Sequence, residues 1–207
     1  MSHAEVSSVA VSPQVLVSLI RDAHEFFRER MVDDRYEYMA LDLIRRYASK
    51  EGVPRESDPL FGAALYVVSR HPWSHPNPMT KVEFASKLNL RESSLDWYTN
   101  SIVENVGFLT LHDQSRQKFF LDPQDTIMSV LESVVRASVG EEMVKGVATG
   151  SVVSPAELSE RIVDRLCSVV KIIPPAFEED LVGVVQRKIE EESQRLLASL
   201  GGKHTFQ

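Results

Sequence analysis

Side chains that can hydrogen-bond to nucleic-acid bases or phosphates gather between residues 91 and 118. Arginine, asparagine, serine, threonine and tyrosine carry donors or acceptors suited to base edges and to the sugar-phosphate backbone. The candidates along one predicted helix are Arg91, Ser93, Ser94, Tyr98, Thr99 and Asn100. Two further cations, Arg116 and Lys118, lie in a predicted hairpin from which they could contact the backbone or the minor groove. Together these residues predict a DNA-binding surface.

The charge of the chain opposes this interpretation. The same predicted helix carries Glu92, Asp96 and Glu104, and only Arg91 offsets them. A helix with this balance repels phosphates, and two hairpin cations add only a small electrostatic contribution. The formal net charge is -7, and the excess acid lies mainly after residue 122. The acidity favours protein partners, so DNA binding and protein docking both stay open.

A metal site is not expected. His71 and His75 are four residues apart, a spacing that can bind a metal on a helix. Pro72 and Pro76 disfavour a helix there, and no third ligand is nearby. The chain has a single cysteine, which excludes a multi-cysteine zinc site and an internal disulfide.

Catalytic motifs are also missing from the sequence. It contains no glycine-rich phosphate loop, no G-x-S-x-G elbow and no H-E-x-x-H motif. The acidic runs 178–180 and 190–192 are predicted to be solvated helix faces, and Cys167 a buried, inert thiol. We therefore expect a protein without enzymatic activity and without a cofactor.

The candidate residues depend on helices that surround a central one. The run PLFGAALYVVSR at residues 59–70 is apolar on nearly every side, which is typical of a hub helix enclosed by others. Two amphipathic helices precede it, one from Pro13 to about Met31 and one after Asp33-Asp34. After it comes the loop HPWSHPNP, in which we expect Trp73 to anchor the loop against the helices.

A helix-turn-helix is predicted next. Thr80 and Glu83 have the capping-box spacing, and Val82, Ala85 and Leu88 are expected to point inward. A short turn at residues 89–91 leads to a helix that ends at Gly107. Its inward residues are predicted to be Leu95, Tyr98, Ile102 and Val106. Two short strands around residues 112–117 then predict a small hairpin.

The remainder of the chain is predicted to be helical. A helix from Gln124 is expected to be followed by a short separate one at 141–148, loosened by glycines. Ser154-Pro155 begins another, whose apolar stripe runs from Leu158 to Val170. After Pro174-Pro175, the apolar stripe of a long last helix either covers the preceding helix or forms a dimer seam.

The predicted architecture is a mostly α protein with one small β-hairpin and an embedded helix-turn-helix. We expect two domains, residues 13–122 and a helical region at 123–200. The N-terminus has neither a basic start nor a long apolar core, and no window approaches 18 apolar residues. We therefore expect a cytoplasmic protein without a membrane span.

Residues 14 to about 107 resemble one cyclin-like repeat of the archaeal and eukaryotic general transcription factor B. The segment FGAALYVVSR is similar to the central helix of that repeat, TKVEFASKL to the fourth helix and ESSLDWYTNSIVENV to the fifth. KEGVPRESD fits the connection before the central helix. The match covers just under half the chain. It lacks the family's cysteine-rich zinc ribbon, and no second repeat can be aligned.

The predicted hairpin after Gly107 instead resembles the wing of a winged-helix domain. Both resemblances contain the helix-turn-helix, and both imply a transcription-associated regulator or accessory factor. The expected partners are double-stranded DNA, proteins of the transcription machinery, and a second copy bound through the C-terminal helices. The alternative is a cyclin-like docking module that binds proteins and no DNA.

Overall fold

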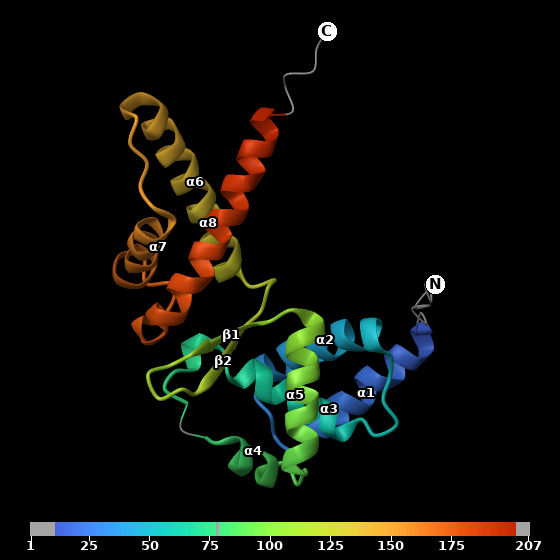
Figure 1. Ribbon diagram of the computed structural model, residues 1–207. Helices are drawn as coiled ribbons and strands as arrows, with labels where there is room; N and C mark the ends of the chain where they lie inside the picture. Colours follow the sequence, from blue (N-terminus) through green and yellow to red (C-terminus); the bar gives the residue numbers. More distant parts are fainter. Residues whose placement is uncertain (1–10, 78, 202–207) are drawn as a thin grey trace, which may run out of the picture. The chain divides into compact units, whose positions relative to one another are not determined.

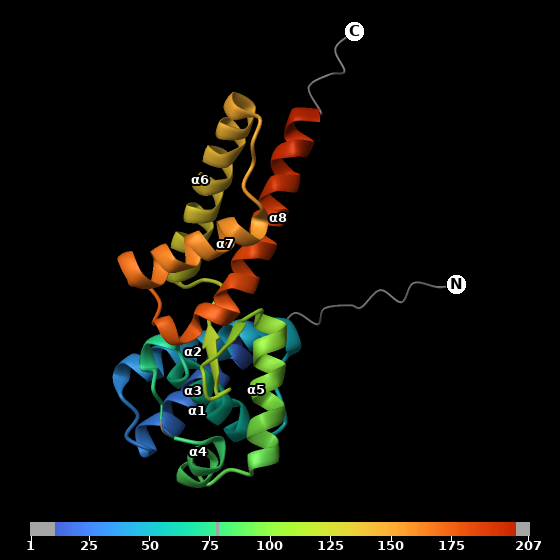
Figure 2. The same ribbon diagram turned by 60° about the vertical axis from the view of Figure 1, so that its left-hand side comes forward.

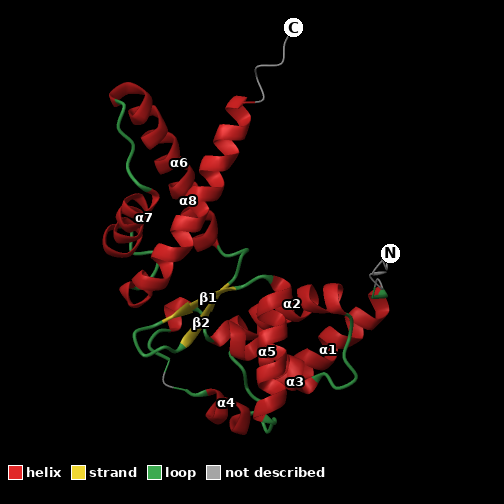
Figure 3. Ribbon diagram, in the orientation of Figure 1, coloured by secondary structure: helices red, strands yellow, loops and turns green. Residues whose placement is uncertain are grey.

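The structure is a computed structural model that describes residues 11–77 and 79–201. It is mostly α-helical with one two-stranded hairpin, as the sequence predicts (Figures 1 and 3). Two compact units make up the chain, one ending at Thr110 and the other beginning at Leu111. This boundary places most of the hairpin in the C-terminal unit, whereas the sequence analysis assigned it to an N-terminal domain ending at residue 122. None of the described helices is both long and apolar enough to cross a membrane.

The described residues of the N-terminal unit form five α-helices and a short 3-10 turn. They are α1 (Pro13–Glu29), α2 (Asp34–Glu51), α3 (Asp58–Ser69), η1 (Pro72–Ser74), α4 (Lys81–Lys87) and α5 (Glu92–Val106). Ser12 caps α1 and Asp33 caps α2, each with a side-chain oxygen that accepts a backbone N–H. Helix α5 ends at Gly107, which adopts the left-handed conformation expected of glycine at this position.

Helix α3 is the centre of this unit, which confirms the predicted hub. Every residue from Leu60 to Val68 is buried, and the helix packs against α1, α2 and α5 (Figures 1 and 2). Phe61 meets the rings of Phe26 and Phe27 at centroid distances of 5.6 Å and 6.4 Å. An aromatic cluster of this kind fixes α1 against the hub.

Two inward positions were predicted wrongly in the N-terminal unit. Trp73, expected to anchor its loop, is 55% exposed, because the loop is held instead by hydrogen bonds. Ser74 Oγ donates to the Ser69 carbonyl and Asn77 Nδ2 to the same oxygen, at 2.8 Å and 3.1 Å. Val82 is also exposed, since it lies in the first turn of the short helix α4, whereas Ala85 and Leu88 are buried as predicted.

The C-terminal unit contains the hairpin and three long helical segments. Its elements are β1 (Leu109–His112), β2 (Lys118–Leu121), α6 (Thr126–Thr149), α7 (Pro155–Asp164), η2 (Arg165–Val169), η3 (Pro175–Phe177) and α8 (Glu178–Gly201). Phe119 of the hairpin packs on Phe177 with ring centroids 5.1 Å apart. Asp180 accepts the His112 backbone N–H at 2.7 Å, and its carboxylate also lies 2.8 Å from the imidazole Nδ1. The start of α8 therefore holds the hairpin.

Helix α6 is continuous, which corrects the prediction of a separate short helix at residues 141–148. It passes through Gly140 and Gly146 and ends at Thr149. The propensity cost of a glycine, about 1 kcal/mol, is smaller than the packing gained by burying residues such as Val139. Close packing explains the glycine at position 146, because a Cβ there would lie 2.7 Å from Val152 Cγ2.

The apolar stripe of α8 is buried within this unit. Leu181, Val184, Val185 and Ile189 are all buried, and α8 packs against α7 and α6. Of the two uses predicted for this stripe, it serves as the intramolecular cover. Val169 and Val170 were predicted to continue the α7 stripe, yet both are exposed. The π-helical turn η2 adds residues to the turn and rotates them off the buried face.

Candidate functional site

The turn between α4 and α5 is fixed on the hub helix. Asn89 takes a left-handed conformation with φ 56°, and Leu90 packs so closely on Gly62 of α3 that a Cβ at this glycine would clash with it. Thr80 and Glu83 form the predicted capping box at the start of α4. Glu83 accepts the Thr80 backbone N–H at 2.8 Å, and the hydrogen bonds from Thr80 lower the pKa of the Glu83 carboxyl. These contacts set where α5 begins.

The structure places the predicted base-contacting residues on several sides of α5. Arg91, Ser93 and Asn100 are exposed, while Ser94 and Tyr98 are half-buried. Burial raises the pKa of the Tyr98 phenol, with smaller contributions from Tyr47 and Glu56. Tyr98 therefore stays neutral at physiological pH.

Thr99 does not belong to the exposed set. Its side chain is 1% exposed, and its hydroxyl donates to the Leu95 carbonyl at 2.7 Å. Thr99 lies four residues after Leu95 and three before Ile102, both buried, so it is on the face of α5 that packs on α3. This corrects its assignment as a DNA-contacting residue.

Arg116 and Lys118 are exposed, but they belong to the other unit. Both lie in the hairpin, Arg116 at its tip with φ 62° and Lys118 at the start of β2. The structure therefore groups Arg91, Ser93, Ser94, Tyr98 and Asn100 in one unit and the two hairpin cations in the second.

The residue that the sequence analysis missed is Trp97. Its side chain is 61% exposed in the middle of α5. The helical period puts Trp97 opposite the buried residues Leu95, Ile102 and Val106. The exposed residues on this outer side, which we call the α5 strip, are Ser93, Trp97, Asn100 and Glu104. Their spacing of four, three and four residues was the signal in the sequence that could have identified the strip.

One ring contact supports the indole, and hydrogen bonds to α2 fix the helix that carries it. The rings of Trp97 and Tyr98 meet edge to face at 4.7 Å between centroids. On the flank toward α2, the Tyr47 hydroxyl lies 2.8 Å from Ser101 Oγ, and Lys50 Nζ donates to the Asn105 carbonyl at 3.0 Å. A rigid helix therefore presents an exposed indole, which costs little side-chain entropy on binding.

The charge around the α5 strip is negative. Glu104 lies within it and Glu92 beside it, both exposed. Asp96 is ion-paired with Lys81 of α4, so this lysine is already engaged. Arg91, the N-cap residue, is the only lysine or arginine in residues 91–106. Beside Arg91 lies a hollow of about 460 Å³ whose lining includes Ser57, Asp58 and Ser94. The arrangement suits a partner with positive charge better than a phosphate backbone.

No metal centre emerges from the described ranges 11–77 and 79–201. Within them, no group of three or more His, Cys, Asp or Glu side chains is placed to hold an ion. His71 instead accepts the Trp73 backbone N–H on Nδ1 at 3.2 Å, which caps the 3-10 turn η1.

Cys167 is buried, as predicted. Burial raises the pKa of its thiol to about 11, and Glu178 and Asp164 add to the rise. A thiol with this pKa has almost no thiolate at neutral pH and is a poor nucleophile.

This thiol makes a testable contribution to stability at high pH. In the unfolded chain the thiol ionises near pH 8.5, whereas in the folded protein its pKa is about 11. The stability that the neutral thiol contributes is therefore complete below about pH 8.5. It is lost as the pH rises toward about 11. The unfolding free energy of the wild type should therefore fall more steeply than that of Cys167→Ala, by up to about 1.4 kcal/mol per pH unit. Urea unfolding at several pH values measures this difference. Parallel pH profiles for the two proteins would contradict the prediction.

Comparison with known proteins gives no assignment. No family model matches the chain, and a search of curated proteins finds no match.

Proposed function

We propose that the N-terminal unit is a non-catalytic docking module that binds a protein of the transcription machinery through the α5 strip. The observation that carries this proposal is Trp97, an indole 61% exposed at the centre of a rigid helix. Exposed tryptophans are strongly enriched among the residues that dominate protein interfaces.

The α5 strip also indicates the chemistry of the partner. To bind the indole, the partner needs an apolar pocket with one hydrogen-bond acceptor for the indole N–H. Glu104 and Glu92 call for lysine or arginine at the rim of that pocket. Ser93 and Asn100 supply uncharged hydrogen-bonding groups on either side of Trp97. A basic protein groove meets all three requirements.

The assignment to transcription comes from the resemblance of residues 14 to about 107 to a cyclin-like repeat. Such repeats commonly serve as protein-docking modules, and those of general transcription factor B act at promoters. The enclosed hub helix and the α4–turn–α5 arrangement are compatible with this resemblance. RNA polymerase and its general factors are therefore the partners to test first. Homodimerisation of the chain is a separate proposal that involves the C-terminal unit.

DNA binding is the second candidate function. It is favoured by the exposure of Arg91, Ser93 and Asn100 after a tight turn, and of Arg116 and Lys118 in the hairpin. Recognition helices of helix-turn-helix proteins contact bases with residues near their N-terminal end, where Arg91 and Ser93 lie. The acidic residues of α5 weigh against it, and for this reason protein docking is the primary proposal.

Binding experiments with the full chain separate the two functions. Fluorescence anisotropy with a labelled mixed-sequence duplex at low salt measures DNA affinity, and biolayer interferometry with purified RNA polymerase from the source organism measures docking. We expect micromolar or tighter binding to the polymerase and none to the duplex. If the duplex binds instead, Arg116→Ala with Lys118→Ala should weaken binding and flatten its salt dependence, since each phosphate contact adds about one unit to the salt slope. Duplex binding without polymerase binding would overturn the docking proposal.

A further inference from the structure

Helix α6 has an outer face without charge, most of which is exposed in the described part of the chain. Val144 is 71% exposed and Val147 is 91% exposed. The residues that follow one another along this face are Val130, Ser133, Ala137, Gly140, Val144 and Val147, which we call the α6 seam. Ser133 satisfies its own hydroxyl by donating to the Ser129 carbonyl at 2.8 Å. The outer face of α8, by contrast, carries Arg187, Glu190 and Gln194, as a solvated helix does.

The spacing along the α6 seam is that of a coiled coil. Its residues recur at alternating steps of three and four, so they occupy positions a and d of a heptad from Val130 to Val147. The buried residues Leu131, Val135 and Val139 lie on the opposite side of the helix and pack within the unit. One helix thus has two uncharged sides, one buried in its own unit and one that is mostly exposed.

Gly140 leaves room for close approach at the seam. A Cβ at this position would meet nothing within 4 Å, so packing within the unit does not require glycine. Its φ does not require glycine either, since it is not in the left-handed region. Glycine in the middle of a helix is destabilising relative to alanine. Together with Ala137 in the adjacent layer, it lets a second helix backbone come close.

The surface beside the seam is hollowed and partly apolar. A hollow of about 390 Å³ follows α6, lined among others by Ser133 and Ala137 and bounded by Arg165 and Val170. Val170 and Val169 are exposed because of the π-helical turn η2. The hollow extends the apolar area available to a helix lying along the seam.

Charges flanking the seam define which helix fits. Arg136 precedes Ala137 and occupies heptad position g, while Glu141 follows Gly140 and occupies position e. In a parallel two-stranded coiled coil, position g of one helix faces the e position five residues further along the other. Arg136 would therefore face Glu141 of a second copy, twice by symmetry. In an antiparallel pair, g positions face g positions and e positions face e positions. No Arg136–Glu141 ion pair would then form between the two helices.

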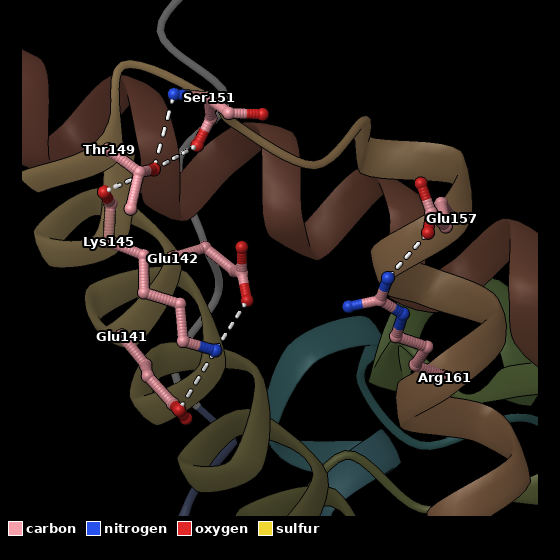
Figure 4. Close-up of polar contacts among 7 residues, drawn as sticks. All are labelled: Glu141, Glu142, Lys145, Thr149, Ser151, Glu157 and Arg161. Carbon is pink, nitrogen blue, oxygen red and sulfur yellow. Dashed lines mark hydrogen bonds and ion pairs between the residues drawn. The ribbon is translucent and has the colours of Figure 1, made fainter. Parts of the chain in front are cut away.

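Both flanking side chains are available for such pairs. Arg136 is 64% exposed and lies 3.6 Å from Glu192 of α8. Glu141 is 68% exposed and shares Lys145 with Glu142, at 3.1 Å and 3.0 Å (Figure 4). Glu192 also accepts from Arg195 at 3.0 Å, so this buried carboxylate keeps a partner when Arg136 turns toward a second copy.

We propose that a second copy of this chain packs along the α6 seam, so that two α6 helices form a short parallel coiled coil. The Arg136–Glu141 pairs select the parallel orientation. The seam spans about 26 Å at 1.5 Å per residue, so the dimer is expected to be reversible and dependent on concentration. The dimer does not depend on what the α5 strip binds.

Sedimentation equilibrium of the full chain over the micromolar range tests the proposal. The mass is expected to rise from 23.3 kDa toward twice that value as concentration increases. Ala137→Glu places two like charges at facing a positions and should weaken the dimer more than about tenfold. Gln194→Glu on the outer face of α8 is the matched control and should leave it unchanged. A monomer at every concentration, or a dimer that Ala137→Glu does not affect, would overturn the proposal.

A charge exchange and a cysteine test the orientation. Arg136→Glu and Glu141→Arg should each weaken the dimer about tenfold, and the double exchange should restore it. Ser133→Cys should form an intermolecular disulfide under mild oxidation, because equivalent d positions face each other only in the parallel pair. The native Cys167 is buried and will not interfere, and Gln194→Cys should not cross-link. A dimer that fails both tests is not the parallel coiled coil proposed.

Discussion

Replacing Phe61 with alanine is expected to destabilise the N-terminal unit by about 3–5 kcal/mol, the range for truncating a buried phenylalanine. Phe61 is 1% exposed in the hub helix α3 and meets Phe26 and Phe27. Its removal loses the transfer free energy of the ring and leaves a cavity at the junction of α1 and α3. Because α3 is enclosed by other helices, the surroundings can collapse only partly around this cavity.

Tryptophan fluorescence during urea unfolding measures the loss of stability of the N-terminal unit. Both tryptophans of the chain, Trp73 and Trp97, lie in the N-terminal unit, so their emission reports on that unit alone. Val82→Ala is the matched control in the same unit, since Val82 is exposed and should change stability by less than about 0.5 kcal/mol. A loss below about 1 kcal/mol for Phe61→Ala would show that α3 is not the central element of the unit.

Trp97→Ala is expected to weaken binding to RNA polymerase by about 2–4 kcal/mol, or roughly 30- to 1,000-fold. The truncation removes the largest apolar surface of the α5 strip and the edge-to-face contact with Tyr98. The fold of the unit should be unaffected, because the indole lies opposite the buried face of α5. Loss of affinity would then be a property of the interface and not of misfolding.

The chain offers a matched control for this substitution. Trp73 is 55% exposed in the loop after α3, and Trp73→Ala removes an indole of nearly equal exposure from another part of the unit. Isothermal titration calorimetry with each variant should give an unchanged dissociation constant for Trp73→Ala. Equal losses for the two variants would mean that the polymerase does not recognise the α5 strip.

Much of the fold could be predicted from periodicity and capping. The run Leu60–Val68 is apolar on all sides, so a central helix was the only way to bury it. Thr80 and Glu83 predicted the start of α4 because their capping box is local in sequence. The continuity of α6 was not predicted, because the low helix propensity of Gly140 and Gly146 suggested a break. This propensity is a weak effect, and packing keeps the helix continuous through both glycines.

The candidate site was harder to predict. The DNA-contacting residues were predicted from their hydrogen-bonding capacity. This criterion included Thr99, although its position in the helix puts it on the buried face. The same criterion left out Trp97, whose contribution to binding would come mainly from apolar area. Exposure depends on which side of α5 meets α3, a tertiary property that a single helix does not encode. The placement of Arg116 and Lys118 in a second unit depends in turn on long-range contacts of the hairpin with α8.

Observing Trp97 itself during binding is the most direct test of docking through the α5 strip. A Trp73→Phe variant retains Trp97 as its only tryptophan, and 5-hydroxytryptophan incorporated there can be excited apart from the tryptophans of RNA polymerase. Acrylamide quenching of this residue should be efficient in the free protein, where the side chain is 61% exposed, and strongly reduced in the complex. Equal quenching in the free and bound states would contradict the proposal that the α5 strip is the docking surface.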